Sequence, residues 1–209
     1  MASPSSPPDP VELWPQVQPE AARRLMRAGL ESFARRGYHA TTTRHIATGA
    51  GMSPAALYVH FSSKAALLTE ISRSGHEWTL SLVRQAVARG TDPVERMRAL
   101  VEEFVAWHAE QHVVARVAQY ELAALPEEAH RVVKGLRRET EQVVRSTIRD
   151  GVEAGVFDVP DVRVAARAVL SLGIDVARWY SERGPRTPAD LGQEYADLVL
   201  RMLGVRPAR

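Results

Sequence analysis

Helical spacing of apolar residues is the feature that most limits what this chain can fold into. The pattern starts at Glu20, and its first segment has apolar residues at positions 22, 25, 26, 29, 30, 33 and 34, which is typical of an amphipathic helix. Gly37 predicts the end of this helix, because glycine readily adopts the left-handed conformation past a helix C-terminus. Similar patterns, punctuated by Gly, Pro, Ser and Thr, predict helices over residues 43–50, 54–61, 63–88, 93–109, 112–124, 127–154, 161–182 and 189–203. Because no alternating run rich in Val, Ile or Thr is long enough for a strand, the predicted fold is all-α with about nine helices.

Length and composition narrow the class of protein. The 209 residues, 45% hydrophobic and 25% charged, suffice for one mid-sized domain or for a small domain joined to a larger one. The chain has no cysteine, which excludes disulfides and cysteine-based metal or redox sites. It also shows no transmembrane-length apolar run and no secretory signal, so we expect a cytoplasmic protein without membrane association. Residues 1–19 hold six of the thirteen prolines and are expected to form a disordered leader, with docking of Trp14 on the body as the alternative.

Basic residues are concentrated near the N-terminus. From Glu20 to Lys64 there are seven Lys or Arg against two Asp or Glu, whereas the residues from 65 onward have 20 basic and 21 acidic side chains. Such asymmetry is consistent with an anionic partner for the first block, either nucleic acid or a membrane surface, and also with chance.

The same block contains the outline of a helix-turn-helix. The two short predicted helices, 43–50 and 54–61, flank Gly51, and Ser53 followed by Pro54 is a well-matched helix start. In a helix-turn-helix the second helix enters the major groove of DNA. The side chains expected to face outward are Thr43, Arg44, Ser53, Ala55, Ala56, Tyr58 and His60.

The stretch TTTRHIATGAGMSPAALYVHFSSKAALL, residues 41–68, resembles the DNA-binding domain of TetR-family transcriptional regulators. The resemblance implies a DNA-binding domain over residues 20–66 and a helical domain for effector binding and dimerisation over residues 67–209. It further implies that the hydroxyls of Thr43 and Tyr58, with His60, contact phosphates, that Arg44 contacts a base edge or a phosphate, and that Pro54, Ala55 and Ala56 meet the groove. Val59 departs from the family, since many members have an aromatic residue there.

Lys64 is one of only two lysines, and it occupies the start of a predicted helix, where the helix dipole disfavours a cation. The resemblance implies that a DNA phosphate offsets this cost. The alternative for Lys64 and for Arg44 is a solvated side chain. For Tyr58 it is a core position with its hydroxyl in solvent, and for His60 it is packing under the turn.

Within the family, residues 151–157 and 179–204 resemble the effector domains of repressors of lipid, acyl-CoA and steroid degradation. This resemblance implies a pocket for a bulky ligand such as an acyl-CoA. Its candidate lining residues are Trp78, Trp107, His108, Arg116, Tyr120, Arg137 and Arg138, and the alternative is that the aromatic residues are core and the charged ones solvated. Small and apolar residues of the last two helices are candidates for a dimer interface, or else for the chain's own core: Ala165, Ala168, Leu172, Val176, Leu191, Tyr195, Leu198 and Met202.

These features predict a homodimeric repressor that a small hydrophobic or acyl-CoA-type ligand releases from a palindromic operator. The alternatives are a regulator of efflux or multidrug genes with another ligand, a helical enzyme, and a helical partner-binding protein. An enzyme is not expected, because the chain lacks a Gly-rich phosphate loop, a nucleophile elbow and a cysteine nucleophile. His108 and His112 are four positions apart and could lie on one helix face as metal ligands, but HAEQH is not the HExxH zinc signature. We therefore expect no metal and no other cofactor.

Overall fold

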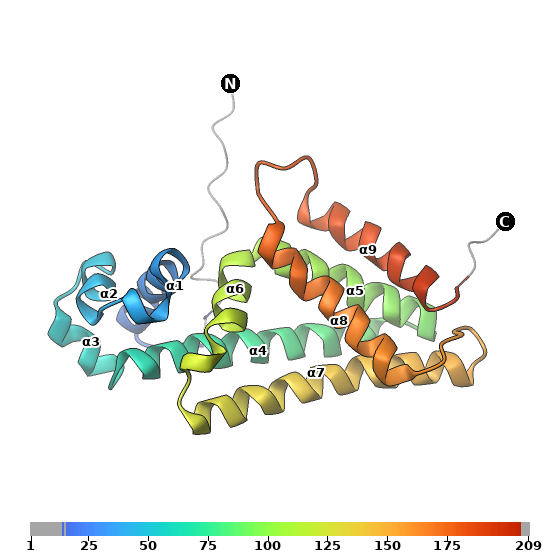
Figure 1. The fold of residues 1–209 in the computed structure, drawn as a ribbon, viewed down its shortest axis with the longest axis horizontal. Helices are drawn as coiled ribbons and strands as arrows, with labels where there is room; N and C mark the ends of the chain where they lie inside the picture. The colour runs from blue at the N-terminus through green and yellow to red at the C-terminus, as the bar shows by residue number, and fades with distance from the viewer. Residues whose placement is uncertain (1–13, 15, 206–209) are drawn as a thin grey trace. The chain divides into compact units, whose positions relative to one another are not determined.

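The computed structural model describes Trp14 and residues 16–205, and this part of the chain contains helices and no strand (Figure 1). The predicted all-α class is therefore confirmed. The elements are α1 (Glu20–Ala40), α2 (Thr43–Gly49), α3 (Pro54–His60), α4 (Lys64–Arg89), α5 (Pro93–Glu110), α6 (His112–Tyr120), the 3-10 turn η2 (Leu122–Ala124), α7 (Glu127–Glu153), α8 (Val162–Trp179) and α9 (Pro188–Met202).

The described residues divide into two compact units. Unit 1 lies within Met1–Gly75 and Val117–His130, and unit 2 consists of His76–Arg116 and Arg131–Arg209. The division differs from the predicted domains, 20–66 and 67–209, in two respects. It falls inside α4, which has no break that a sequence pattern would reveal, and it assigns the end of α6 and η2 to unit 1.

The expected disordered leader is wrong for its last part. Trp14 is only 1% exposed, and its carbonyl accepts a hydrogen bond from the Val17 N–H at 3.0 Å. Arg23 of α1 donates to the Val17 carbonyl at 3.0 Å. Residues 1–13 and 15 of the expected leader lie outside the described residues. A large aromatic ring had enough apolar surface to be buried despite the proline-rich composition around it.

Unit 1 contains the packed helices α1, α2 and α3. Its core combines most of the apolar residues that the helical pattern selected on α1 with residues of the short helices and of the start of α4. Large members that are 2% exposed or less include Leu25, Met26, Phe33, Ile46, Leu57, Leu67, Leu68 and Ile71. Gly37 has a positive φ of 74°, which confirms the predicted end of the regular part of α1.

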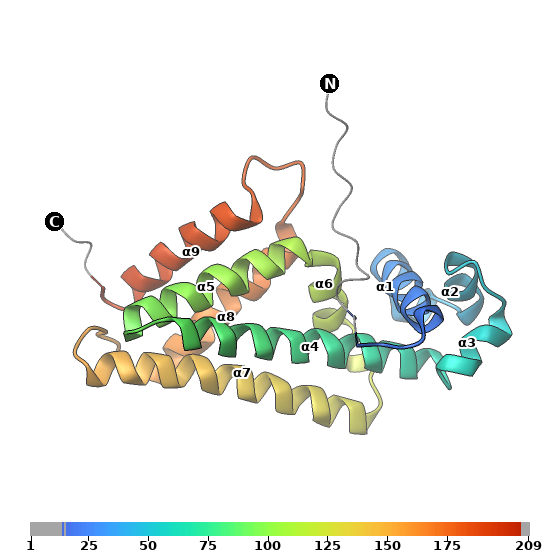
Figure 2. The ribbon, with the colours of Figure 1, turned by 180° about the vertical axis from the view of Figure 1, so that it is seen from behind.

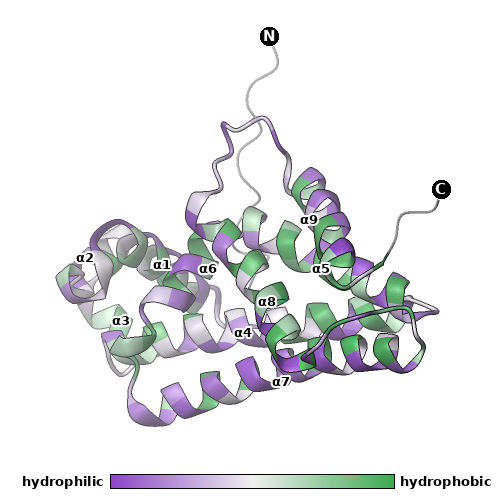
Figure 3. Cartoon of the chain, turned by 45° about the vertical axis from the view of Figure 1, so that its right-hand side comes forward, coloured by the Kyte–Doolittle hydropathy of each residue, from purple (hydrophilic) through white to green (hydrophobic). Residues whose placement is uncertain are grey.

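In unit 2, α5 packs against α9 and α8 (Figure 2). The contact with α9 is close, because a Cβ built on Gly192 would lie 2.5 Å from the carbonyl oxygen of Glu102 in α5. The unit 2 parts of α4 and α7 run side by side in both views and are joined by an ion pair between Arg84 and Glu139 at 2.8 Å (Figures 1 and 2). Hydrophobic and hydrophilic residues alternate along the helices (Figure 3), as expected for amphipathic helices around a core.

Candidate nucleic-acid interface

The start of α2 is fixed by a reciprocal cap. The Thr42 hydroxyl accepts the His45 N–H at 3.2 Å, and the His45 Nδ1 accepts the Thr42 N–H at 3.3 Å. These two bonds satisfy backbone donors that a helix start leaves without partners. Ile46 and Ala47 are fully buried, whereas Arg44 is exposed and Thr43, in the first turn of the helix, is half-buried.

The turn after α2 is held by α1. Gly51 has a φ of 66°, a conformation that favours glycine, and the Met52 N–H donates to the Ala47 carbonyl at 2.8 Å. The guanidinium of Arg24 donates to the Ala50 carbonyl at 2.6 Å. A Cβ on Gly51 would lie 3.2 Å from that guanidinium, so the turn needs glycine for its conformation and for space.

The predicted cap of α3 is confirmed. The Ser53 hydroxyl accepts the Ala56 N–H at 3.3 Å. Pro54 occupies the first turn of α3, where its missing backbone N–H costs no hydrogen bond, because N–H groups in the first turn have no partner within the helix. Leu57 is fully buried against the unit 1 core, whereas Tyr58 is 56% and Val59 79% exposed. Pro54 and Ala55 are also exposed.

Together these contacts bring most of the predicted DNA-binding residues onto two consecutive short helices. Of the set from Thr43 to His60, the exposed members are Arg44, Ser53, Pro54, Ala55 and Tyr58, and the half-buried members are Thr43, Ala56 and His60. Tyr58 is 56% exposed, so the alternative of a core position for it is not what the structure shows.

Lys64 has a different environment from the one that the sequence predicts. Its ammonium donates to the carbonyl oxygens of Tyr38 and Thr41, both at 2.6 Å, and lies 4.1 Å from the centre of the Tyr38 ring. Burial lowers the pKa of Lys64, and the nearby carboxylate of Glu121 partly opposes this. The ammonium charge of Lys64 is unfavourable at the start of α4. It is offset by hydrogen bonds to carbonyl oxygens at the end of α1, where the helix dipole favours a cation.

Glu121 is a residue that sequence reasoning missed. Its carboxylate accepts the Tyr38 N–H at 3.2 Å, across 83 positions of the chain. Glu121 and Lys64 thus hold the residues just after Gly37 from two sides. No local pattern marks such a contact, because it depends on a 3-10 turn that the sequence predicted as part of one helix, 112–124.

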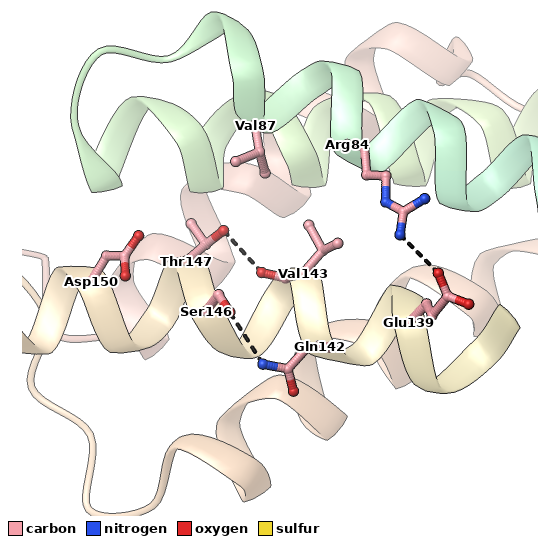
Figure 4. A pocket seen from close by; sticks show the side chains of 8 residues that line it. All are labelled: Arg84, Val87, Glu139, Gln142, Val143, Ser146, Thr147 and Asp150. Atoms are coloured by element: carbon pink, nitrogen blue, oxygen red, sulfur yellow. Dashed lines mark hydrogen bonds and ion pairs between the residues drawn. The ribbon is translucent and has the colours of Figure 1, made fainter. Parts of the chain in front are cut away.

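The seven predicted effector residues differ in exposure. Trp78, Tyr120 and Arg138 are exposed, Arg116 and Arg137 are half-buried, and Trp107 and His108 are buried. None of them lines the polar groove of about 350 Å³ between α4 and α7 (Figure 4). Several polar groups of that groove are paired with one another, as Arg84 with Glu139 and Gln142 with Ser146, so the groove gives no sign of a ligand.

Trp107 and His108 are two buried residues of unit 2 whose rings contain hydrogen-bonding nitrogen atoms. The Trp107 Nε1–H is buried without a hydrogen-bond partner. The His108 Nδ1 lies 2.7 Å from the Phe104 carbonyl, and because a carbonyl only accepts, Nδ1 carries the proton and Nε2 a lone pair. Burial lowers the pKa of His108 to about 4, so this ring is neutral at physiological pH.

Two of the predicted dimer residues are wrong. Val176 and Leu191 are 0% and 4% exposed and belong to the core of unit 2, since helical spacing does not distinguish a chain's own core from a partner's surface. Leu198 and Met202 are exposed, and Ala165, Ala168, Leu172 and Tyr195 are half-buried. Val164 and Trp179 of α8, which were not among the predicted residues, are 64% and 46% exposed.

Residues 14 and 16–205 offer neither a metal-binding cluster nor a helix that could span a membrane. These residues contain no group of three or more His, Cys, Asp or Glu side chains that could hold a metal ion. Within the same residues, no helix combines the length and apolar character that a membrane span requires.

Known proteins resemble the chain along most of its length. Residues 25–71 match the model for bacterial regulatory proteins of the tetR family, and residues 90–203 match that of the tetracyclin repressor-like C-terminal domain. The HTH-type transcriptional repressor KstR2 of Mycobacterium tuberculosis is 30% identical over 180 residues, covering 84% of this chain and 89% of KstR2. The solved structure of this ketosteroid transcriptional regulator has a TM-score of 0.82, is 28% identical, and is matched over 90% of this chain and 96% of that one.

Two more solved structures share the fold. A tetR-family regulatory protein from Rhodococcus RHA1 is 39% identical with a TM-score of 0.86, over 91% of this chain and 100% of that one. AibR, solved with isovaleryl coenzyme A and operator DNA, is 22% identical with a TM-score of 0.77, over 88% and 97%, and shows the fold alone. Because the second family model covers more than half of the chain and KstR2 is 30% identical over most of it, the chain belongs to the TetR family of DNA-binding transcriptional regulators.

Proposed function

We propose that the chain is a homodimeric, ligand-released repressor in the cytoplasm, and that α2 and α3 supply its contacts with operator DNA. The observation that carries the proposal is the capped pair of short helices whose outer side chains are exposed while Ile46 and Leu57 anchor them to α1. The proposed DNA contacts are Thr43, Arg44, Ser53, Pro54, Ala55, Ala56, Tyr58 and His60. For Lys64 we propose a supporting role, because its ammonium is already bonded to two carbonyls.

Dimerisation is proposed because a palindrome is read by two recognition helices about 34 Å apart. Four exposed apolar side chains of α8 and α9 support it: Val164, Trp179, Leu198 and Met202. Contiguous exposed apolar surface marks protein interfaces, and we propose that these side chains contribute to one. The half-buried residues Ala165, Ala168, Leu172 and Tyr195 complete the proposed surface.

The effector proposal rests on Trp107 and His108. A buried indole N–H without a partner costs free energy that a ligand's oxygen would recover. The Trp107 Nε1–H is a donor that suits a carbonyl oxygen, such as that of a ketone or thioester, whereas the neutral His108 Nε2 is an acceptor and needs a donor on the ligand. KstR2 is a ketosteroid regulator and AibR binds isovaleryl coenzyme A, so both ligand types are candidates. We propose that the phosphates of a CoA ligand are bound by the guanidinium groups of Arg116, Arg137 and Arg138.

The DNA proposal predicts a salt-dependent, sequence-selective complex. Selection from random duplexes at moderate salt should return a palindrome, and Arg44→Ala should weaken its binding by about tenfold or more. Arg149→Ala, on an exposed position of α7, is the matched control and should leave affinity unchanged. Binding that shows no preference over random DNA, or equal effects of both variants, would contradict the proposal.

The effector proposal predicts a specific change at one indole. In a ¹⁵N spectrum of the four tryptophans, Trp107→Phe identifies the Trp107 Nε1–H resonance. A ligand that releases the operator, with isovaleryl coenzyme A and a 3-ketosteroid as probes, should shift this resonance downfield. Trp107→Phe should lower the affinity for that ligand about fivefold to tenfold and leave the affinity for DNA unchanged. Release of DNA without any shift of this resonance would show that the ligand is held elsewhere.

A further inference from the structure

The outer surface of α3 is unusually poor in groups that can read a base by hydrogen bonding. Pro54, Ala55 and Val59 present only carbon atoms, and all three are exposed. The Ser53 hydroxyl is engaged as the helix cap, and His60 is half-buried. Tyr58 is therefore the one fully exposed side chain of α3 with a hydrogen-bonding group.

Val59 is the most distinctive of these residues. At 79% it is the most exposed large hydrophobic side chain among residues 14 and 16–205. Valine is a poor choice for an exposed helical position on two grounds, since it has low helix propensity and gains nothing from burial there. Ala55 lies four positions earlier, so the two side chains are neighbours on one face of α3. An apolar pair on this face calls for an apolar group opposite it.

In the major groove, the apolar group that bases present is the C5 methyl of thymine. We propose that Ala55 and Val59 form a methyl-reading surface, and that the operator is recognised chiefly by thymine methyl groups at fixed positions of each half-site. The inference rests on the proposed placement of α3 on DNA. It makes Val59 a specificity-determining residue, at a position where the sequence showed only a departure from the family.

The test replaces single thymines of the selected operator by deoxyuridine, which removes the methyl group and keeps every hydrogen-bonding group. Withdrawing one methyl group from a contact corresponds to about a fourfold loss of affinity, and to about fifteenfold when both half-sites are changed. The expected result is such a loss at one or two thymines per half-site, and none at thymines outside the half-sites. Replacing a cytosine by 5-methylcytosine at a position where thymine is preferred should recover part of the affinity.

The variant Val59→Ala tests whether Val59 is the residue that contacts the thymine methyl group. Because Val59 is exposed, the variant should melt at the wild-type temperature. Its affinity for the thymine operator should fall, while the penalty for deoxyuridine at one of the sensitive positions should nearly vanish. Val59→Thr, which keeps one methyl group at the same place, should retain part of that penalty.

The outcomes separate this inference from the proposed function. Failure to select any operator would overturn DNA recognition by α3 and the methyl inference together. Selective binding with equal affinity for the deoxyuridine and thymine operators would overturn methyl reading alone. A deoxyuridine penalty that is the same in the wild type and in Val59→Ala would show that other side chains contact the methyl groups.

Discussion

Gly192→Ala is expected to lower the stability of unit 2 by about 3 kcal/mol, which corresponds to a fall of roughly 6 to 12 °C in melting temperature. The added Cβ would lie 2.5 Å from the Glu102 carbonyl oxygen and 3.2 Å from the Glu102 Cα. All of these atoms belong to backbone or are bonded to it, so no rotamer change relieves the clash. The two helices α5 and α9 must move apart, and the core residues between them lose contacts.

Gly135→Ala is the matched control for this prediction. Gly135 lies within α7, and a Cβ there would meet nothing within 4 Å. Alanine removes the conformational freedom of glycine in the unfolded chain, so this variant should gain roughly 0.5–1 kcal/mol. Thermal unfolding followed by circular dichroism measures both variants. Equal stability of Gly192→Ala and the wild type would show that α5 and α9 are not as close as described.

The fold was predictable because its signals are local. Helix starts such as Ser53 with Pro54, and helix ends such as Gly37, are set by which backbone groups need partners and which residues tolerate the required dihedral angles. The apolar face of α1 follows from the spacing of residues such as Leu25 and Phe33 alone. Each of these signals depends on residues a few positions apart, so the helices can be predicted from a single sequence.

The parts of the candidate site that were not predictable depend on distant residues. Glu121 reaches Tyr38 across 83 positions, and the burial of Val176 in the chain's own core depends on where α5 lies. Trp107 was predicted as a pocket residue from its type. That its Nε1–H is buried without a partner is a property of the packed structure, and no pattern of neighbouring residues reports it.

Lys64→Met is expected to weaken operator binding while leaving its salt dependence unchanged. Methionine keeps an unbranched stem beside the Tyr38 ring but leaves the carbonyls of Tyr38 and Thr41 without their charged donor. Charge-assisted hydrogen bonds contribute roughly 1.5–3 kcal/mol each when buried, and solvent access to this half-buried side chain reduces the expected loss to about 2 kcal/mol for the pair. Urea unfolding of the full chain measures this loss.

The salt dependence separates the two possible roles of Lys64. If its ammonium contacts a phosphate, Lys64→Met reduces the slope of log K against log salt by about one per site. If it serves the carbonyls at the end of α1, the slope stays at the wild-type value, and affinity falls because the α1–α2 connection that positions Arg44 is less firmly held. Glu121→Gln should then also weaken binding without a change of slope, since it removes the charge beside Lys64 but keeps an acceptor for the Tyr38 N–H. A reduced slope in Lys64→Met with unchanged stability would show that the Lys64 ammonium contacts a DNA phosphate.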